Sequence, residues 1–177
     1  MTIHFGDSTS IASGGSLGKV IQQVSVTKTN AASASVGSQS IWDYNDSSLM
    51  VTITGTSTSN KFLFIGQVTV GGARIHVGLR DNSTTTNVTG MTATSASNRR
   101  PAASGASAGS SDSHSSATVP IIGLISVPDT NQHQYFFRFS HTSGSTRTIY
   151  LNETESQGDN AERGRYISSL TVMEISA

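Results

Sequence analysis

Apolar and polar residues alternate with a period of two along most of this chain, which limits the folds it can adopt more than any other feature. In LMVTITGT, Leu49, Val51 and Ile53 share one side and threonines occupy the other. Such alternation is typical of strands that bury one face. We predict strands over 19–28, 37–43, 48–55, 60–71, 73–80, 118–127, 133–142, 146–153 and 164–175. Because turn residues separate them and no helix is indicated, we expect an all-β protein, an antiparallel sandwich or a closed barrel.

The composition agrees with short strands and excludes several classes of partner. Only 12% of the residues are charged, and serine, threonine, glycine and asparagine, which disfavour helix interiors, are common. Eleven basic and eleven acidic residues cancel, so no overall charge recruits nucleic acid or an anionic membrane. The absence of cysteine excludes disulfides and thiolate metal sites. No apolar run approaches the roughly eighteen residues of a membrane span.

Three of the predicted strands are apolar on both faces. They are FLFIGQV at 62–68, VPIIGLISV at 119–127 and YFFRF at 135–139. Only one face of a sheet meets the core of an antiparallel sandwich, so the second apolar face needs another cover. A second copy of the chain would supply that cover. The alternative is that these are central strands overlaid by loops of their own chain.

The first eighteen residues contain too few apolar side chains to form a core. We expect this segment to become ordered by docking on another molecule, and a disordered leader is the alternative. The side chains predicted to make the anchoring contacts are Ile3, Phe5, Ile11 and Leu17.

The glycine-rich stretch SGGSLGKV at 13–20 raises the possibility of a phosphate-binding loop. Such a loop requires Ser or Thr after the lysine and a helix beyond it. Here Lys19 is followed by Val20 and by a strand pattern. We therefore interpret the stretch as a flexible joint before the first strand.

Residues 81–117 form the longest interval without large side chains. The interval is almost entirely Ser, Thr, Ala, Gly and Asn. Loops of this length are uncommon inside a domain and are usually functional or mobile. We expect this one to lie over the surface or over a neighbouring subunit.

Three stretches carry a resemblance to a known family: STSNKFLFIGQVTVGG, TVPIIGLISVPDTNQHQYFFRFSHTSG and the C-terminal ISSLTVMEISA. With the leader IHFGDSTS, they resemble the small virion proteins of tailed bacteriophages, especially those of marine and cyanobacterial hosts. In that family a short anchoring segment precedes a jelly-roll domain similar to the trimeric heads of the tumour necrosis factor and complement families. The resemblance implies an anchor over 1–18, a jelly-roll trimerisation domain over 19–177, and attachment to a larger capsid or tail protein. The interval 81–117 has no clear counterpart in the family.

The resemblance also implies that aromatic side chains meet at a three-fold axis. Phe62 and Phe64 are two residues apart, as are Phe137 and Phe139, so each pair shares a face of its strand. We expect one of these pairs, or a residue next to it, to line the trimer interface.

No motif indicates a metal, a cofactor or catalysis. The five histidines lack the short paired spacing of a structural zinc site. The acidic stretch 153–162 does not match the twelve-residue calcium loop, which favours a solvated hairpin tip over a calcium site. Serine is abundant, but no Gly-x-Ser-x-Gly elbow is present. We predict a protein that is not an enzyme.

Two functions remain as hypotheses. The leading one is a structural virion protein, a trimeric knob, fibre head or capsid decoration protein assembled in the host cytoplasm. The rival is an adhesion module of a tail-fibre tip that binds a host-surface glycan. For the rival, Trp42 and Tyr44 share a face and could stack on sugar, although the same pair could be core or interface.

Overall fold

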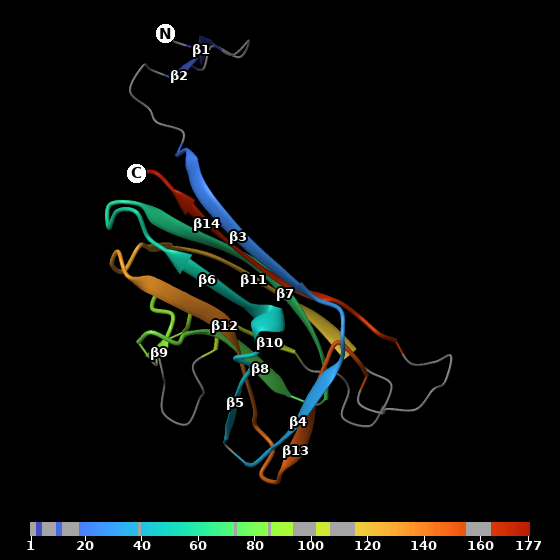
Figure 1. Ribbon diagram of the computed structural model, residues 1–177. Coiled ribbons are helices and arrows are strands. Elements are labelled where there is room, and N and C mark those ends of the chain that lie inside the picture. The colour runs from blue at the N-terminus through green and yellow to red at the C-terminus, as the bar shows by residue number, and fades with distance from the viewer. Residues whose placement is uncertain are drawn as a thin grey trace.

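The computed structural model describes residues 3–4, 10–11, 18–38, 40–72, 74–84, 86–93, 102–106, 116–154 and 164–177. Within these ranges the chain is all-β, and its helical structure is a single 3-10 turn, η1 (Ser47–Leu49). Two antiparallel sheets form a sandwich (Figure 1). The predicted all-β, antiparallel sandwich is confirmed.

One sheet of the sandwich has six strands built around β7. Its members are β3 (Val20–Lys28), β14 (Ser168–Ile175), β7 (Lys61–Gly71), β13 (Arg147–Leu151), β4 (Ala32–Val36) and β11 (Ser116–Ser126). β7 pairs with β14 over 61–67, with β13 at 70–71, and with β11 along its whole length. β11 pairs with β7 alone among the described strands, so it forms an edge of this sheet.

The other sheet is built around β12 and also has six strands. Its members are β10 (Ser104–Ala106), β8 (Ile75–Asp81), β12 (Gln132–His141), β5 (Ile41–Asp43), β6 (Met50–Thr54) and β9 (Thr86–Asn87). β8 pairs with β12, while β5 and β6 pair with successive parts of β12. β9 and β10 both pair with β8, so the interval 81–117 contains two short strands.

The core lies between the two sheets, and its largest side chains come from β7 and β12. Phe62 and Phe64 from β7 meet Tyr135 from β12, with ring centroids 4.9 Å apart for Phe64 and Tyr135 in an edge-to-face contact. Phe137 and Phe139 extend this aromatic layer along β12. All five side chains are fully buried. Edge-to-face packing of this kind stabilises the pair beyond the burial of apolar area.

This burial corrects the expected trimer contact. Phe62, Phe64, Phe137 and Phe139 are each 0% exposed within a single chain. They therefore offer no surface to a second copy. The strand alternation was correct, but the aromatic side of each strand is the side that the partner sheet covers.

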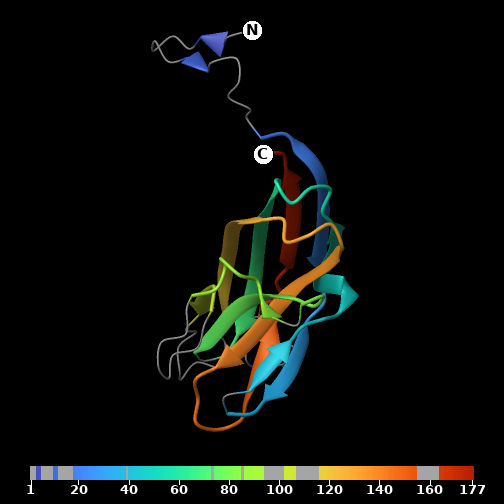
Figure 2. The same cartoon turned by 90° about the vertical axis from the view of Figure 1, so that its left-hand side faces the viewer.

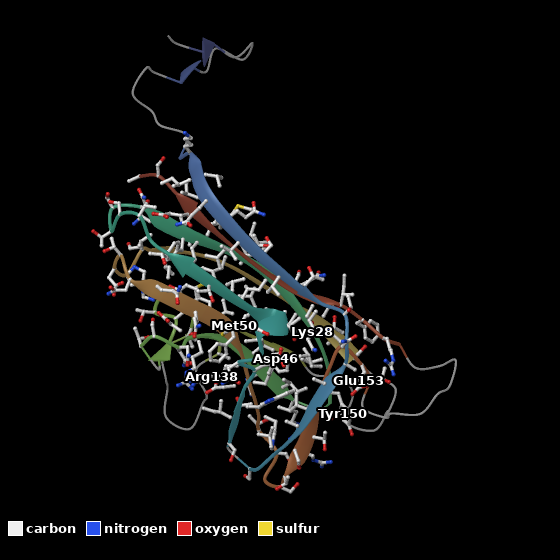
Figure 3. The ribbon with its side chains drawn as sticks, in the orientation of Figure 1. Lys28, Asp46, Met50, Arg138, Tyr150 and Glu153 are labelled. Atoms are coloured by element: carbon white, nitrogen blue, oxygen red, sulfur yellow. The ribbon has the colours of Figure 1, made fainter. Side chains whose placement is uncertain are left out.

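β12 shows that one of the doubly apolar strands is covered on both sides by its own chain. Phe136 points away from the core and is nevertheless 1% exposed. In the register it is the partner of Met50 on β6 and of Arg80 on β8. Met50 lies on the neighbouring strand β6, and Arg138 lies on β12 itself (Figure 3). For 135–139 the alternative of cover by the chain itself is therefore correct.

The strand predictions differ from the structure at 32–43. The predicted strand 37–43 is shortened to β5, because residues 37–40 form a turn in which Ser40 N donates to Gly37 O at 3.0 Å. β4 precedes this turn and was not predicted. Its sequence, ASASV, has small residues on the buried side, so the apolar alternation is weak.

The start of β3 and the C-terminus lie at the same end of the sandwich. β3 and β14 run side by side, in blue and red, in Figure 2. Ser176 N donates to Lys19 O at 2.9 Å, which joins the first described residues of the domain to its last ones.

A buried carboxylate stabilises this end of the domain. Glu174 on β14 is 0% exposed, and its oxygens accept hydrogen bonds from Gln22 Nε2 at 2.6 Å, Thr56 N at 2.9 Å and Asn60 Nδ2 at 2.7 Å. Burial alone would raise the pKa of this carboxyl group. The hydrogen bonds from Asn60, Gln22 and Thr56 outweigh burial and lower the pKa to about 2.

The N-terminal segment contains a two-stranded ladder. β1 (Ile3–His4) and β2 (Ser10–Ile11) pair antiparallel, with Ile3 opposite Ile11. Two of the predicted anchoring residues are therefore register partners. The other two, Phe5 and Leu17, lie outside the described residues.

Candidate functional site

Two strands carry apolar side chains on the face that points away from the core. Leu63 and Ile65 on β7 are the register partners of Leu124 and Ile122 on β11. Ile65, Ile122 and Leu124 are 43%, 71% and 58% exposed. Side chains directly opposite each other on paired strands are in contact range, so these four residues form one surface, the outer apolar patch.

The position of the patch follows from the alternation of the strands. Because Phe62 and Phe64 point into the core, Leu63 and Ile65 must point outward. On β7, β11 and β14, the outward residues of the described chain carry a single charge, that of Lys61 at the end of β7. The Lys61 ammonium group donates to Ser126 Oγ at 2.9 Å. The surroundings of the patch are otherwise neutral.

A cavity of about 430 Å³ opens where β11, the edge of one sheet, faces β8 and β9 of the other sheet. Its lining includes the apolar residues Val88, Ile125 and Pro128 and the polar residues Asp81 and Asn87. Cavities of this size and mixed lining are typical of sites for small molecules.

Tyr135, one of the residues that line the cavity, has a buried hydroxyl group without a hydrogen-bond partner among the described residues. The residue is 0% exposed. Burial, together with the nearby carboxylates of Asp81 and Asp129, raises the pKa of this hydroxyl above its usual range. Tyr135 is therefore neutral and has a hydrogen to donate.

Asp81, the second polar group, is held in place by its neighbours. Its carboxylate accepts hydrogen bonds from Ser83 N at 3.0 Å and lies 2.7 Å from His133 Nδ1. The His133 ring stacks on the ring of Tyr135 at a centroid distance of 5.8 Å. The orientation of Asp81 is thus set before any ligand enters.

Ser83, His133 and Asp81 do not form the arrangement of a serine hydrolase. In such a triad the serine and the aspartate use opposite nitrogens of the imidazole. Here Ser83 Oγ and Asp81 both lie against Nδ1, at 2.8 and 2.7 Å, while Nε2 faces Asp129 at 3.0 Å. No ring nitrogen is left to take a proton from Ser83 and pass it to a leaving group.

The predicted glycan platform is largely inside the domain. Tyr44 is 6% exposed, and Trp42 packs between Tyr44 and Phe139 with centroid distances of 5.4 Å to each ring. Lys28 Nζ lies 5.5 Å from the centroid of the Tyr44 ring. Figure 3 shows Lys28 and Asp46 in this part of the domain. The alternative that the pair belongs to the core holds for Tyr44.

The histidine and acidic residues of the described ranges do not group as metal ligands, since no three of their side chains are placed so that they could hold a metal ion. The backbone of Glu153 forms an isolated bridge with Arg165, and 155–163 lie outside the described residues, as does His114. His141 is buried, with Nε2 2.9 Å from Val36 O, and therefore has a structural hydrogen bond.

The sequence comparisons identify no family for this chain. No family model matches the chain, and no curated protein has a significant match to it. In the part of the chain that the structure describes, no helix has the length and apolar character needed to cross a membrane. The outer apolar patch and the cavity are therefore the two features of the described surface that bear on function.

Proposed function

We propose that this chain is a non-enzymatic structural subunit of a tailed-bacteriophage virion, a trimeric knob, fibre head or decoration protein. Its sandwich serves as a jelly-roll trimerisation domain, and its N-terminal segment attaches it to a larger capsid or tail protein. The outer apolar patch is the observation that supports this proposal. Of the three strands with two apolar faces, β7 and β11 keep their outward apolar side chains exposed in the patch. The second face of β12 is covered by its own chain.

The energetic reason for association is the cost of leaving the patch in water. Full burial of an isoleucine or leucine side chain is worth about 1.5–3 kcal/mol. Ile122 and Leu124 retain more than half of their surface exposed, and Ile65 nearly half. Three copies that bury their patches against one another would gain this energy at each contact.

The neutrality of the patch favours a second copy of the chain as its occupant. In a symmetric assembly a surface meets the same or a neighbouring surface of an identical subunit, so charges on it tend to face like charges. Apart from Lys61 at the end of β7, the outward residues around the patch are uncharged: Gln67, Thr118, Pro120, Thr171 and Met173. A contact between copies would therefore bring few like charges together.

Sedimentation of the intact chain tests the trimer. We expect a mass of three times 18.5 kDa at micromolar concentration. A monomer under these conditions would contradict the proposal.

Removal of residues 1–17 tests the anchor. The shortened chain should keep the same assembly state and the same unfolding midpoint, while it no longer binds to particles that lack the protein. Unfolding of the shortened chain, or undiminished binding to such particles, would refute the anchoring role.

A further inference from the structure

We propose that the cavity between β11 and the β8–β9 side of the sandwich binds one neutral sugar residue of a carbohydrate, with the Tyr135 hydroxyl and the Asp81 carboxylate as its polar contacts. This assignment concerns a site separate from the Trp42 and Tyr44 pair. It is also independent of whether the chain forms trimers.

The unpartnered Tyr135 hydroxyl is the first observation. A buried polar group without a hydrogen bond costs about 1–3 kcal/mol, so native proteins rarely contain one without a reason. The Tyr135 ring already packs on Phe62 and Phe64, and phenylalanine would make the same contacts. Folding therefore accounts for the ring of Tyr135, a residue that lines the cavity, but not for its buried hydroxyl.

The mixed lining of the cavity is the second observation. Val88, Ile125 and Pro128 contribute apolar groups to it, while Asp81 and Asn87 contribute polar ones. A sugar ring likewise combines C–H groups on its face with hydroxyl groups around its edge. Its hydroxyls can donate to Asp81 and accept from Tyr135, which gives the Tyr135 hydroxyl the partner it lacks.

Asn87 is oriented for such a contact. Its Oδ1 accepts a hydrogen bond from Arg138 Nη1 at 2.7 Å, and Arg138 Nε in turn donates to Asp43 at 2.6 Å. The amide of Asn87 is thus held by a residue on the outer side of the sheet. A preorganised amide of this kind is typical of sites that select ligand geometry.

The charge of the cavity excludes the other ligand classes. An anion would meet the carboxylate of Asp81, with that of Asp129 nearby. A metal ion would lack sufficient ligands among the described residues. A purely apolar ligand would leave the Tyr135 hydroxyl unsatisfied, which is costly. A neutral molecule with several hydroxyls fits all of these conditions.

Saturation-transfer NMR of the intact protein with a panel of free sugars tests the assignment. The panel contains neutral hexoses, deoxyhexoses and N-acetylhexosamines, with a uronic acid as the anionic control. We expect saturation transfer to at least one neutral sugar and none to the uronic acid. No transfer to any neutral sugar, or transfer to the uronic acid alone, would overturn the proposal.

Tyr135→Phe removes only the hydroxyl and should weaken binding by about tenfold, the value of one lost hydrogen bond. Asp81→Asn is the second variant, and it should weaken binding because one carboxylate oxygen becomes an amide NH2 group. Tyr150→Phe, a half-buried tyrosine on β13 outside the cavity, is the matched control and should bind as the parent does. Unchanged binding in both cavity variants would refute the site.

The test is separate from that of the trimer. Leu124 belongs to both the outer apolar patch and the cavity lining, so it is left unchanged. Loss of sugar binding in Tyr135→Phe with an unchanged sedimentation mass would assign the defect to the cavity alone.

Discussion

Tyr135 on β12 and Asp81 on β8 are direct register partners, and both are buried residues of the cavity lining. Burial, with a contribution from the Asp81 carboxylate, raises the pKa of the Tyr135 hydroxyl, which makes no hydrogen bond with any described residue. The pair therefore combines a preorganised acceptor with an unused donor.

Tyr135→Phe should not destabilise the protein in the absence of ligand. The substitution removes a buried hydroxyl without a partner and keeps the ring contacts, so the free energy of unfolding should stay the same or rise by up to about 1 kcal/mol. Urea unfolding of both proteins measures this. A loss of more than about 1 kcal/mol would show that the hydroxyl has a structural partner, and the cavity would then lose its unpaired donor.

Ile65→Ser with Ile122→Ser should weaken self-association without unfolding the subunit. Both side chains point away from the core, and each loses about 1 kcal/mol or more of apolar burial per contact. The trimer should dissociate at protein concentrations at least tenfold higher than for the parent. Sedimentation over a concentration series measures the shift.

Ile41→Ser is the matched control for the patch. Ile41 is 49% exposed but lies on β5, in the other sheet. If Ile41→Ser dissociates the assembly and the patch variant does not, the interface has been placed on the wrong face.

The protein should become less stable in acid, because the stabilisation that the Glu174 carboxylate contributes is lost when it is protonated. Its pKa is about 2 in the folded chain against an ordinary 4.5, so the carboxylate contributes its stabilisation above pH 4.5 and loses it as the pH falls towards 2. A shift of this size corresponds to roughly 3 kcal/mol. Glu174→Gln should unfold more easily at neutral pH and show a weaker dependence on pH over that range. Chemical unfolding at a series of pH values compares the two, and parallel pH curves would contradict the assignment.

Asn152 should be the most sensitive polar residue of the core. It is fully buried with φ at 62°, its Nδ2 donates to Lys28 O at 2.9 Å, and its Oδ1 accepts from Ser168 Oγ. Asn152→Ala removes these bonds and places a methyl group in a left-handed conformation, at a cost of about 3 kcal/mol. Thermal or urea unfolding measures the loss.

A glycine variant separates the two causes. Asn152→Gly removes the same hydrogen bonds but tolerates the positive φ, so it should be about 1 kcal/mol more stable than Asn152→Ala. Equal stability of the two variants would show that backbone strain has no part in the effect.

Local alternation was a reliable guide where large apolar residues recur. Ile75, Val77 and Leu79 are buried on β8, and Leu63 and Ile65 point outward on β7 because their neighbours point inward. The pattern failed at β4, whose small residues carry no strong signal. The pattern also did not predict the cavity, because Asp81 and Tyr135 become neighbours only through the pairing of β8 with β12.

The amino-acid sequence by itself determined that the chain is all-β and which side chains of each strand share a face, because a strand turns successive residues to opposite sides. Only the tertiary structure decided which face is covered. Phe62 and Phe64 lie against the other sheet, Phe136 is covered on the opposite side by its own chain, and Ile122 remains exposed. The reason is that burial depends on residues far away in the chain, and a strand with two apolar faces does not itself distinguish between them.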